Sequence, residues 1–141
     1  MERRRFELER RVLTGHLGAD LFKFFNVDSS NTYVELGTRT NSGNIYTLHV
    51  ELDNFPFDIP HVYVKRMLTD KDGNALDKPS SAMHVLSPKN GWTRICHYGS
   101  ASWTPTVSIF KVFVKCRLWL DMYELHLQTG KPIDYYLNHQ E

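Results

Sequence analysis

Apolar residues recur among charged ones in the first part of the chain. Between residues 2 and 17 they follow a pattern that predicts an amphipathic helix. The apolar positions are Phe6, Leu8, Val12, Leu13 and Leu17. The basic positions are Arg3, Arg4, Arg5, Arg10 and Arg11. We interpret these arginines either as a solvated face paired with nearby glutamates or as a docking surface for an acidic partner.

Alternating apolar and polar positions follow and predict β-strands. The expected strands are Tyr33–Arg39, Asn44–Leu52, His61–Leu68 and a short one at Met83–Leu86. Asn41-Ser42-Gly43 provides turn residues for a hairpin between the first two strands. Ahead of them, residues 18–26 carry Leu21 and three phenylalanines, so we expect this connection to pack onto the core.

The region from residue 79 to residue 102 has no sustained periodicity, and a run this long inside a compact domain is more often functional than idle. A long helix is predicted to begin with Thr104 as N-cap and Pro105 at the first helical position. Its apolar stripe is Ile109, Phe113, Cys116, Leu120, Tyr123 and Leu127, widened by Val112, Val114, Leu118 and Trp119. The helix should reach about Gln128 and end at Gly130 and Pro132, after which residues 133–141 form a short tail that packs back.

This order of elements predicts a single α+β domain over residues 1–141. An N-terminal helix, an antiparallel meander of about four strands, an irregular loop and a long central C-terminal helix would pack as helices on one sheet. The hydrophobic content of 41% supports a core, and the net charge of +1 calls for neither nucleic acid nor a membrane surface. No apolar run approaches the roughly 20 residues of a spanning helix, and the polar N-terminus lacks a signal peptide. Two cysteines without a disulfide framework indicate a reducing cytoplasm.

Cys96 is the candidate for chemistry. It lies in a polar segment with Gly99 and several serines, between the irregular region and the long helix, where a thiol has solvent access. The alternative for any one cysteine is a small buried hydrophobe. Cys116 is assigned that structural role because it lies on the apolar stripe of the helix. We therefore expect Cys96 to be the nucleophile and Cys116 to be part of the core.

Several local motifs around Cys96 resemble those of ubiquitin-conjugating enzymes. The stretch from Tyr46 to Leu52, followed by Phe55-Pro56 and Ile59-Pro60, is similar to the family's second strand, its Tyr-Pro loop and its Pro-led third strand. Ile95-Cys96 resembles the family's active-site pair, and Trp103-Thr104-Pro105 resembles its Trp-Ser-Pro. The resemblance covers roughly residues 2–128. The short C-terminal part looks like the compact bacterial members found in operons for antiphage defence, including the CBASS type with a cyclic-nucleotide synthase.

The resemblance implies a transferase that uses no cofactor of its own. Such a protein receives an activated C-terminal glycine from a separate adenylating enzyme, holds it on the cysteine as a thioester and passes it to an amine. The glycine would belong to a ubiquitin-like protein or to a cyclic-nucleotide synthase, and the amine to a protein lysine or a small molecule. The adenylating enzyme would dock on the Arg-rich first helix. No Gly-rich phosphate loop is present, so this chain is not expected to activate its substrate with ATP.

The family's His-Pro-Asn ahead of the cysteine is missing, and residues 83–90 read Met-His-Val-Leu-Ser-Pro-Lys-Asn instead. His84 is assigned a structural role, and Asn90 is either the replacement oxyanion donor or an ordinary turn residue before Gly91. His97 is either a pocket residue or surface, and Trp103 is expected to pack beneath the cysteine loop. The missing Asn keeps open a non-catalytic binding or scaffold module of the same fold. A third alternative is an unrelated thiol enzyme that pairs Cys96 with His97. No metal site is expected, because the spacing of His and Cys frames none.

Overall fold

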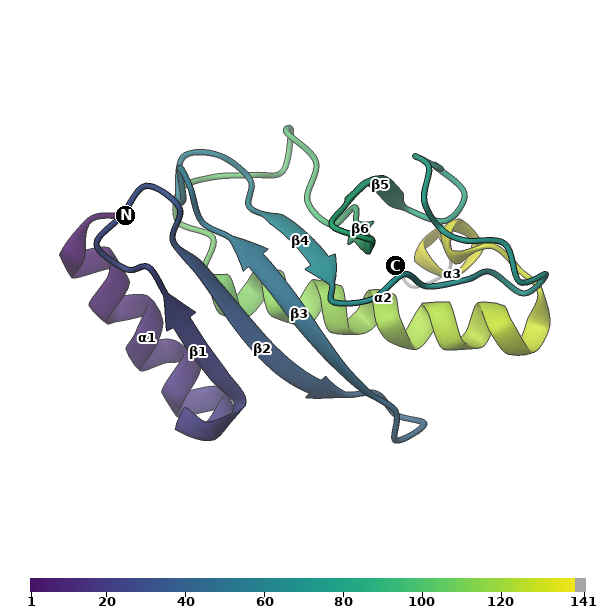
Figure 1. The fold of residues 1–141 in the computed structure, drawn as a ribbon, viewed down its shortest axis with the longest axis horizontal. Helices are drawn as coiled ribbons and strands as arrows, with labels where there is room; N and C mark the ends of the chain where they lie inside the picture. The colour runs from purple at the N-terminus through teal and green to yellow at the C-terminus, as the bar shows by residue number, and fades with distance from the viewer. Residues whose placement is uncertain (139–141) are drawn as a thin grey trace.

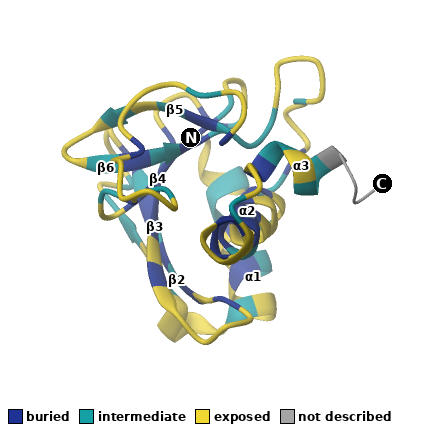
Figure 2. Cartoon of the chain, turned by 90° about the vertical axis from the view of Figure 1, so that its right-hand side faces the viewer, coloured by how far each residue is buried: buried dark blue, intermediate teal, exposed yellow. Residues whose placement is uncertain are grey.

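The computed structural model describes residues 1–138 of the protein. One antiparallel sheet of six strands, in the order β1-β2-β3-β4-β6-β5, forms the first layer, and the helices cover one of its faces (Figures 1 and 2). The elements along the chain are α1 (Arg3–Leu17), the 3-10 helix η1 (Ala19–Leu21), β1 (Phe22–Phe25), β2 (Tyr33–Arg39), β3 (Ile45–Glu51), β4 (His61–Val64), β5 (Val85–Lys89), β6 (Trp92–Ile95), α2 (Ile109–Thr129) and α3 (Ile133–Asn138). The predicted α+β class with an N-terminal helix, an antiparallel sheet and a long C-terminal helix is confirmed.

The central strands form where the alternation predicts them. Tyr33–Arg39 is confirmed to the residue, and β3 lies within the predicted second strand. The third strand is shorter than predicted, because pairing stops at Val64 and the chain bends at Lys65 and Arg66. The inward residues of these strands are fully buried beneath α2, and they are Val34, Leu36, Leu48, Val50 and Val62. This face is the sheet's half of the core.

Two strands, β1 and β6, were not predicted, and the physical reason differs between them. β1 is apolar at three of its four positions, and both of its faces are used: Phe24 packs towards the core, whereas Phe25 stacks on Tyr33 at 4.7 Å. Such a strand shows no alternation. β6 places Thr93 at a fully buried position, where its hydroxyl accepts the Leu68 N–H at 2.9 Å. Because Thr93 is polar although it is buried, the pattern of hydrophobic and polar residues did not indicate a strand here.

The start of α2 differs from the prediction. The helix begins at Ile109 with Ser108 as N-cap, whose hydroxyl accepts the Lys111 N–H at 3.1 Å. Thr104 is not the cap, because its hydroxyl is hydrogen-bonded to Thr106 at 2.7 Å. The predicted end is confirmed, since Gly130 takes a left-handed conformation with φ of 77° and its N–H returns to the His126 carbonyl.

The buried face of α2 is narrower than predicted. Ile109, Val112, Cys116 and Leu120 are completely buried against the sheet. Val114, Leu118 and Leu127, which we expected to be covered, are 37–47% exposed. Figure 1 shows that the C-terminal part of α2 continues beyond the strands of the sheet.

The residues after Gly130 pack back as expected, in the form of α3. Ile133 is fully buried in the core, and the Asp134 N–H donates to the Ala82 carbonyl at 2.8 Å. The end of the predicted tail, residues 139–141, lies outside the described residues. Within residues 1–138, no helix combines the length and apolar character needed to cross a membrane.

Candidate active site around Cys96

Cys96 is the first residue after β6 and opens the loop that leads to α2. Its backbone N–H donates to the His84 carbonyl at 2.9 Å, which fixes the backbone at this point. The side chain is partly exposed and forms no disulfide. Cys116 is completely buried, and burial raises the pKa of its thiol, so it stays protonated in the core. The two thiols therefore have opposite environments, as the sequence suggested.

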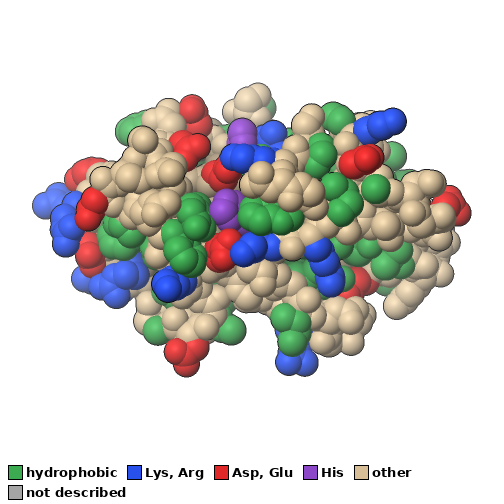
Figure 3. Space-filling model, in the orientation of Figure 1, with side chains coloured by type: hydrophobic (Ala, Val, Ile, Leu, Met, Phe, Trp, Pro, Cys, Tyr) green, Lys and Arg blue, Asp and Glu red, His purple; other side chains and the backbone are tan. Residues whose placement is uncertain are grey.

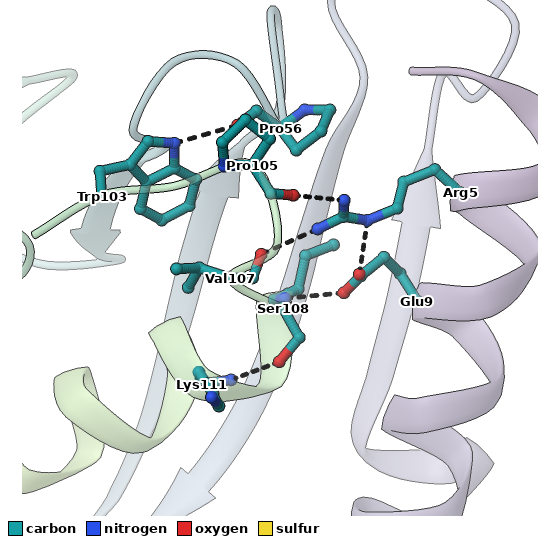
Figure 4. Close-up of polar contacts among 9 residues, drawn as sticks. Arg5, Glu9, Pro56, Trp103, Pro105, Val107, Ser108 and Lys111 are labelled. Atoms are coloured by element: carbon teal, nitrogen blue, oxygen red, sulfur yellow. Dashed lines mark hydrogen bonds and ion pairs between the residues drawn. The ribbon is translucent and has the colours of Figure 1, made fainter.

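The loop after Cys96 is anchored to the segment between β3 and β4. The Trp103 indole N–H donates to the Pro56 carbonyl at 3.0 Å (Figure 4). Tyr98 meets the Trp103 ring edge to face at 5.5 Å, and the Lys115 ammonium lies 3.9 Å from the centroid of the Tyr98 ring. Trp103 therefore holds the loop in place, in agreement with the role that we expected for it. Lys115 was not foreseen, since nothing in the helix pattern distinguishes it from other exposed lysines.

His97 does not form a catalytic pair with Cys96 in this arrangement. Its Nε2 is hydrogen-bonded to the Pro60 carbonyl at 2.8 Å, which commits this nitrogen as the donor. Burial lowers the pKa of His97 to about 4, so the ring is neutral at pH 7. Nδ1 is buried and has no partner within the described chain. A neutral ring of low basicity, held by Pro60, is poorly suited to deprotonating a thiol.

The backbone of His84 contacts Cys96, and its ring contacts Asp134 in α3. Its φ of 51° is unusual for a residue with a side chain, and its carbonyl receives the Cys96 N–H. Its Nε2 lies 2.8 Å from a carboxylate oxygen of Asp134 in α3. This geometry supports the structural role that we assigned to His84.

Asn90 is at the opposite end of the hairpin from Cys96. Asn90 and Gly91 have φ of 56° and 74° and form the tight turn between β5 and β6. Cys96 follows the far end of β6, so about 15 Å of extended chain separates it from this turn. Of the two interpretations that the sequence left open, the turn fits this position, which lies at the opposite end of β6 from Cys96.

The arginines of α1 differ in their surroundings: one makes contacts within the fold, and the others are exposed. Arg5 donates to the carbonyls of Pro105 and Val107 and, through Nε, to Glu9 at 2.8 Å (Figure 4). Glu9 is buried, and its second oxygen accepts the Ile109 N–H at 2.7 Å. Arg5 is therefore held in the contact between α1 and the segment before α2. The exposed members are Arg3, Arg4, Arg10 and Arg11.

A hollow of about 490 Å³ lies beside the start of α1 and was not indicated by the sequence analysis. Met1, Arg5, Phe57 and Pro105 are among the residues that line it. Phe57 is 69% exposed, which is unusual for a phenylalanine. The signal for this surface was an apolar residue, Phe57, placed inside the Pro-containing turn rather than in a strand.

Within residues 1–138, no group of three or more His, Cys, Asp and Glu side chains is arranged to hold a metal ion. Comparison with protein-family models finds no match, and comparisons with curated proteins and with solved structures find no significant match either.

Proposed function

We propose that this protein is a cysteine-dependent acyl transferase with a fold of the ubiquitin-conjugating type, acting in bacterial antiphage defence. The observation that carries the proposal is the environment of Cys96. Cys96 is a partly exposed residue at the end of a strand, and Trp103 fixes the following loop by a hydrogen bond. The order of elements around it agrees with the resemblance described above.

The proposed reaction has two acyl transfers. The Cys96 thiolate attacks the thioester that links a C-terminal glycine to the activating enzyme, so a new C–S bond forms and the enzyme's C–S bond breaks with release of its thiolate. An amine then attacks the glycyl carbonyl. The C–N bond forms, the bond to Cys96 breaks, the amine loses a proton and the Cys96 thiol is regenerated. The overall exchange needs no redox partner and no cofactor.

The oxyanion of the second step requires a hydrogen-bond donor. The Asn90 side chain is remote, as its place in the hairpin turn shows. The backbone N–H groups of Gly99 and Ser100 donate to no other group in the part of the chain described, and they belong to the same loop as Cys96. We assign the donor role to these N–H groups.

The activating enzyme would dock at the hollow beside the start of α1. Exposed Phe57 offers an apolar anchor, and the charged residues that line the hollow are Glu2, Arg5 and Asp53. This places the partner surface at the N-terminal end of α1 instead of along its whole polar face. The partner is expected to present an apolar side chain that packs on Phe57.

A direct test combines the protein with ATP and with the adenylating enzyme and the small glycine-ending protein encoded beside it. Non-reducing gels should show an adduct that dithiothreitol removes. Cys96→Ser should replace it with an adduct that resists dithiothreitol, since an oxygen ester forms, whereas Cys116→Ala should behave as the wild type. An adduct that survives Cys96→Ala would place the attachment elsewhere and refute the proposal.

A second candidate function is a non-catalytic binding module. It is favoured by the absence of a side-chain amide near Cys96, because Asn90 lies in the distant turn. Such a module would bind the activating enzyme or the small protein without forming any adduct. Calorimetric titration alongside the gel assay separates the two functions, since binding without a thioester supports only the module.

A further inference from the structure

The outer face of the sheet, opposite the helices, carries a continuous row of aromatic rings. Phe25 stacks on Tyr33 at 4.7 Å, Tyr33 lies 4.5 Å from His49, and His49 lies 5.0 Å from Trp92 between ring centroids. Figure 3 views this face and shows hydrophobic side chains adjoining a small group of histidine, acidic and basic side chains near its centre. A hollow of about 340 Å³ runs along the row and is lined by Tyr33, His49 and Trp92 among others.

His49 is a nearly buried polar side chain that lines this hollow. It is only 8% exposed, and its Nδ1 lies 2.9 Å from Glu35, which also binds the Lys65 ammonium at 3.1 Å. Burial alone would raise the pKa of Glu35, but the hydrogen bonds from His49 and Lys65 outweigh it and lower the pKa, so Glu35 is ionised. The carboxylate can only accept, so Nδ1 carries the proton. In the neutral ring Nε2 is then an acceptor, and it has no partner among the described residues.

The charged side chains that line the hollow are Glu51, Asp53 and Lys89. Asp53 is exposed and has no ion pair or hydrogen bond within the described chain. Glu51 also lines the hollow, where it binds the Lys89 ammonium at 2.6 Å, so these two charges compensate each other. One carboxylate outside any ion pair of the described chain, one imidazole and two partly exposed aromatic residues, Tyr33 and Trp92, therefore line the same hollow.

The aromatic row already holds cations at two places. The Lys23 ammonium lies 5.2 Å from the Phe25 ring centroid, and the Lys65 ammonium lies 5.5 Å from that of Trp92. Both distances are within the range of cation–π attraction. A ligand that enters the hollow would meet the same kind of ring surface, together with groups that accept hydrogen bonds.

We propose that this hollow is a binding site for a guanidinium group. A guanidinium is planar, so it can lie against the exposed parts of Tyr33 and Trp92, and it has five N–H donors and no acceptor. Those donors match the Asp53 carboxylate and the Nε2 of His49. The group would come either from the arginine side chain of a peptide or from a free metabolite such as agmatine. The site does not involve Cys96 and stands or falls independently of the proposed transferase activity.

The test is a titration of the ¹⁵N-labelled protein followed by NMR. N-acetyl-arginine methylamide represents the peptide source and agmatine the free one, and the tighter of the two identifies the source. The citrulline analogue of the first probe has the same shape without the charge, and it should bind about tenfold more weakly. The shifts should centre on the Trp92 indole N–H and on the amides of Tyr33 and His49.

Two variants test whether the Asp53 carboxylate takes part in binding. Asp53→Asn should weaken binding of the arginine probe severalfold, whereas Asp77→Asn, a change at an exposed carboxylate outside the hollow, should leave it unchanged. Both substitutions are at exposed positions, so the fold should be retained, and the spectrum of each variant checks this. The proposal is overturned if the citrulline probe binds as tightly as the arginine probe, if the shifts centre elsewhere, or if adenosine binds here and arginine does not.

Discussion

The Glu9 carboxylate of α1 accepts the backbone N–H of Ile109, the first residue of α2, at 2.7 Å. The two residues are 100 positions apart in sequence, so one helix supplies an acceptor for the unsatisfied first turn of the other. The same carboxylate binds Arg5, which reaches on to the carbonyls of Pro105 and Val107. This small network sets where the loop from Cys96 ends and where α2 begins.

Removing the Glu9 carboxylate is expected to destabilise the fold strongly. Glu9→Ala should lower the free energy of unfolding by about 2–4 kcal/mol, because the Ile109 N–H and the Arg5 guanidinium both lose a buried acceptor. Glu7→Ala is the matched control. It removes an exposed pair with Arg10 and should cost under about 1 kcal/mol. Urea denaturation measures both, and equal effects would contradict the role of Glu9.

The two thiols should differ sharply in reactivity. A disulfide reagent added to the folded protein at pH 8 is expected to modify one cysteine quickly, and Cys96→Ser should abolish that reaction. Cys116 should react only after denaturation, because burial both shields its thiol and raises its pKa. Two rapidly reacting thiols, or none, would contradict the environments described for Cys96 and Cys116.

Stability should fall between pH 6.5 and pH 4 because of His97. In the unfolded chain this ring takes up a proton near pH 6.5, whereas burial lowers its pKa to about 4 in the folded state. The unfolded state therefore binds more protons in this window, so the stabilisation is complete above pH 6.5 and is lost as the pH falls. Between pH 7 and pH 5 the loss should be about 2 kcal/mol.

His97→Gln removes the titrating ring and should flatten the profile by that amount, while its amide can still donate to the Pro60 carbonyl. The other groups are the same in both proteins, so their contributions cancel in the difference. Urea denaturation at the two pH values measures it, and NMR titration of the His97 ring checks the cause. A ring that titrates near pH 6.5 in the folded protein would rule this explanation out.

Trp103 should control the mobility of the loop after Cys96. Trp103→Phe keeps an aromatic ring but removes the hydrogen bond to Pro56, at a cost of about 1 kcal/mol. Hydrogen exchange across residues 97–107 is expected to accelerate. Tyr46→Phe is the control, because it removes a side-chain hydrogen bond of at least equal strength, to Glu124, in another part of the core. It should leave exchange in this loop unchanged, and acceleration in both variants would make the effect a general loss of stability.

Local signals and distant contacts account for what the sequence could and could not predict. The alternation of Tyr33–Arg39 and the glycine at position 130 act within a few residues, and both predictions are confirmed. The start of α2 depends on Glu9 and the orientation of the His97 ring depends on Pro60, which lies 37 positions away. Such contacts leave no trace in a local pattern.

The same distinction applies to the candidate site. Cys96 could be singled out because its neighbours are polar, whereas the arginines of α1 could not be divided into structural and exposed members. Asn90-Gly91 is a strong hairpin signal, and giving it full weight would have revealed β6 and removed Asn90 from the site. The row of rings on the outer face involves four strands, so no single segment reveals it.

His84 joins the end of the described chain to the nucleophile. Its ring reaches Asp134, and its carbonyl holds the backbone of Cys96. A displacement of α3 would therefore be transmitted through His84 to the backbone N–H of Cys96. One residue, His84, thus connects two segments that lie about 40 positions apart in the sequence, and the position of α3 is expected to be felt in the backbone at Cys96.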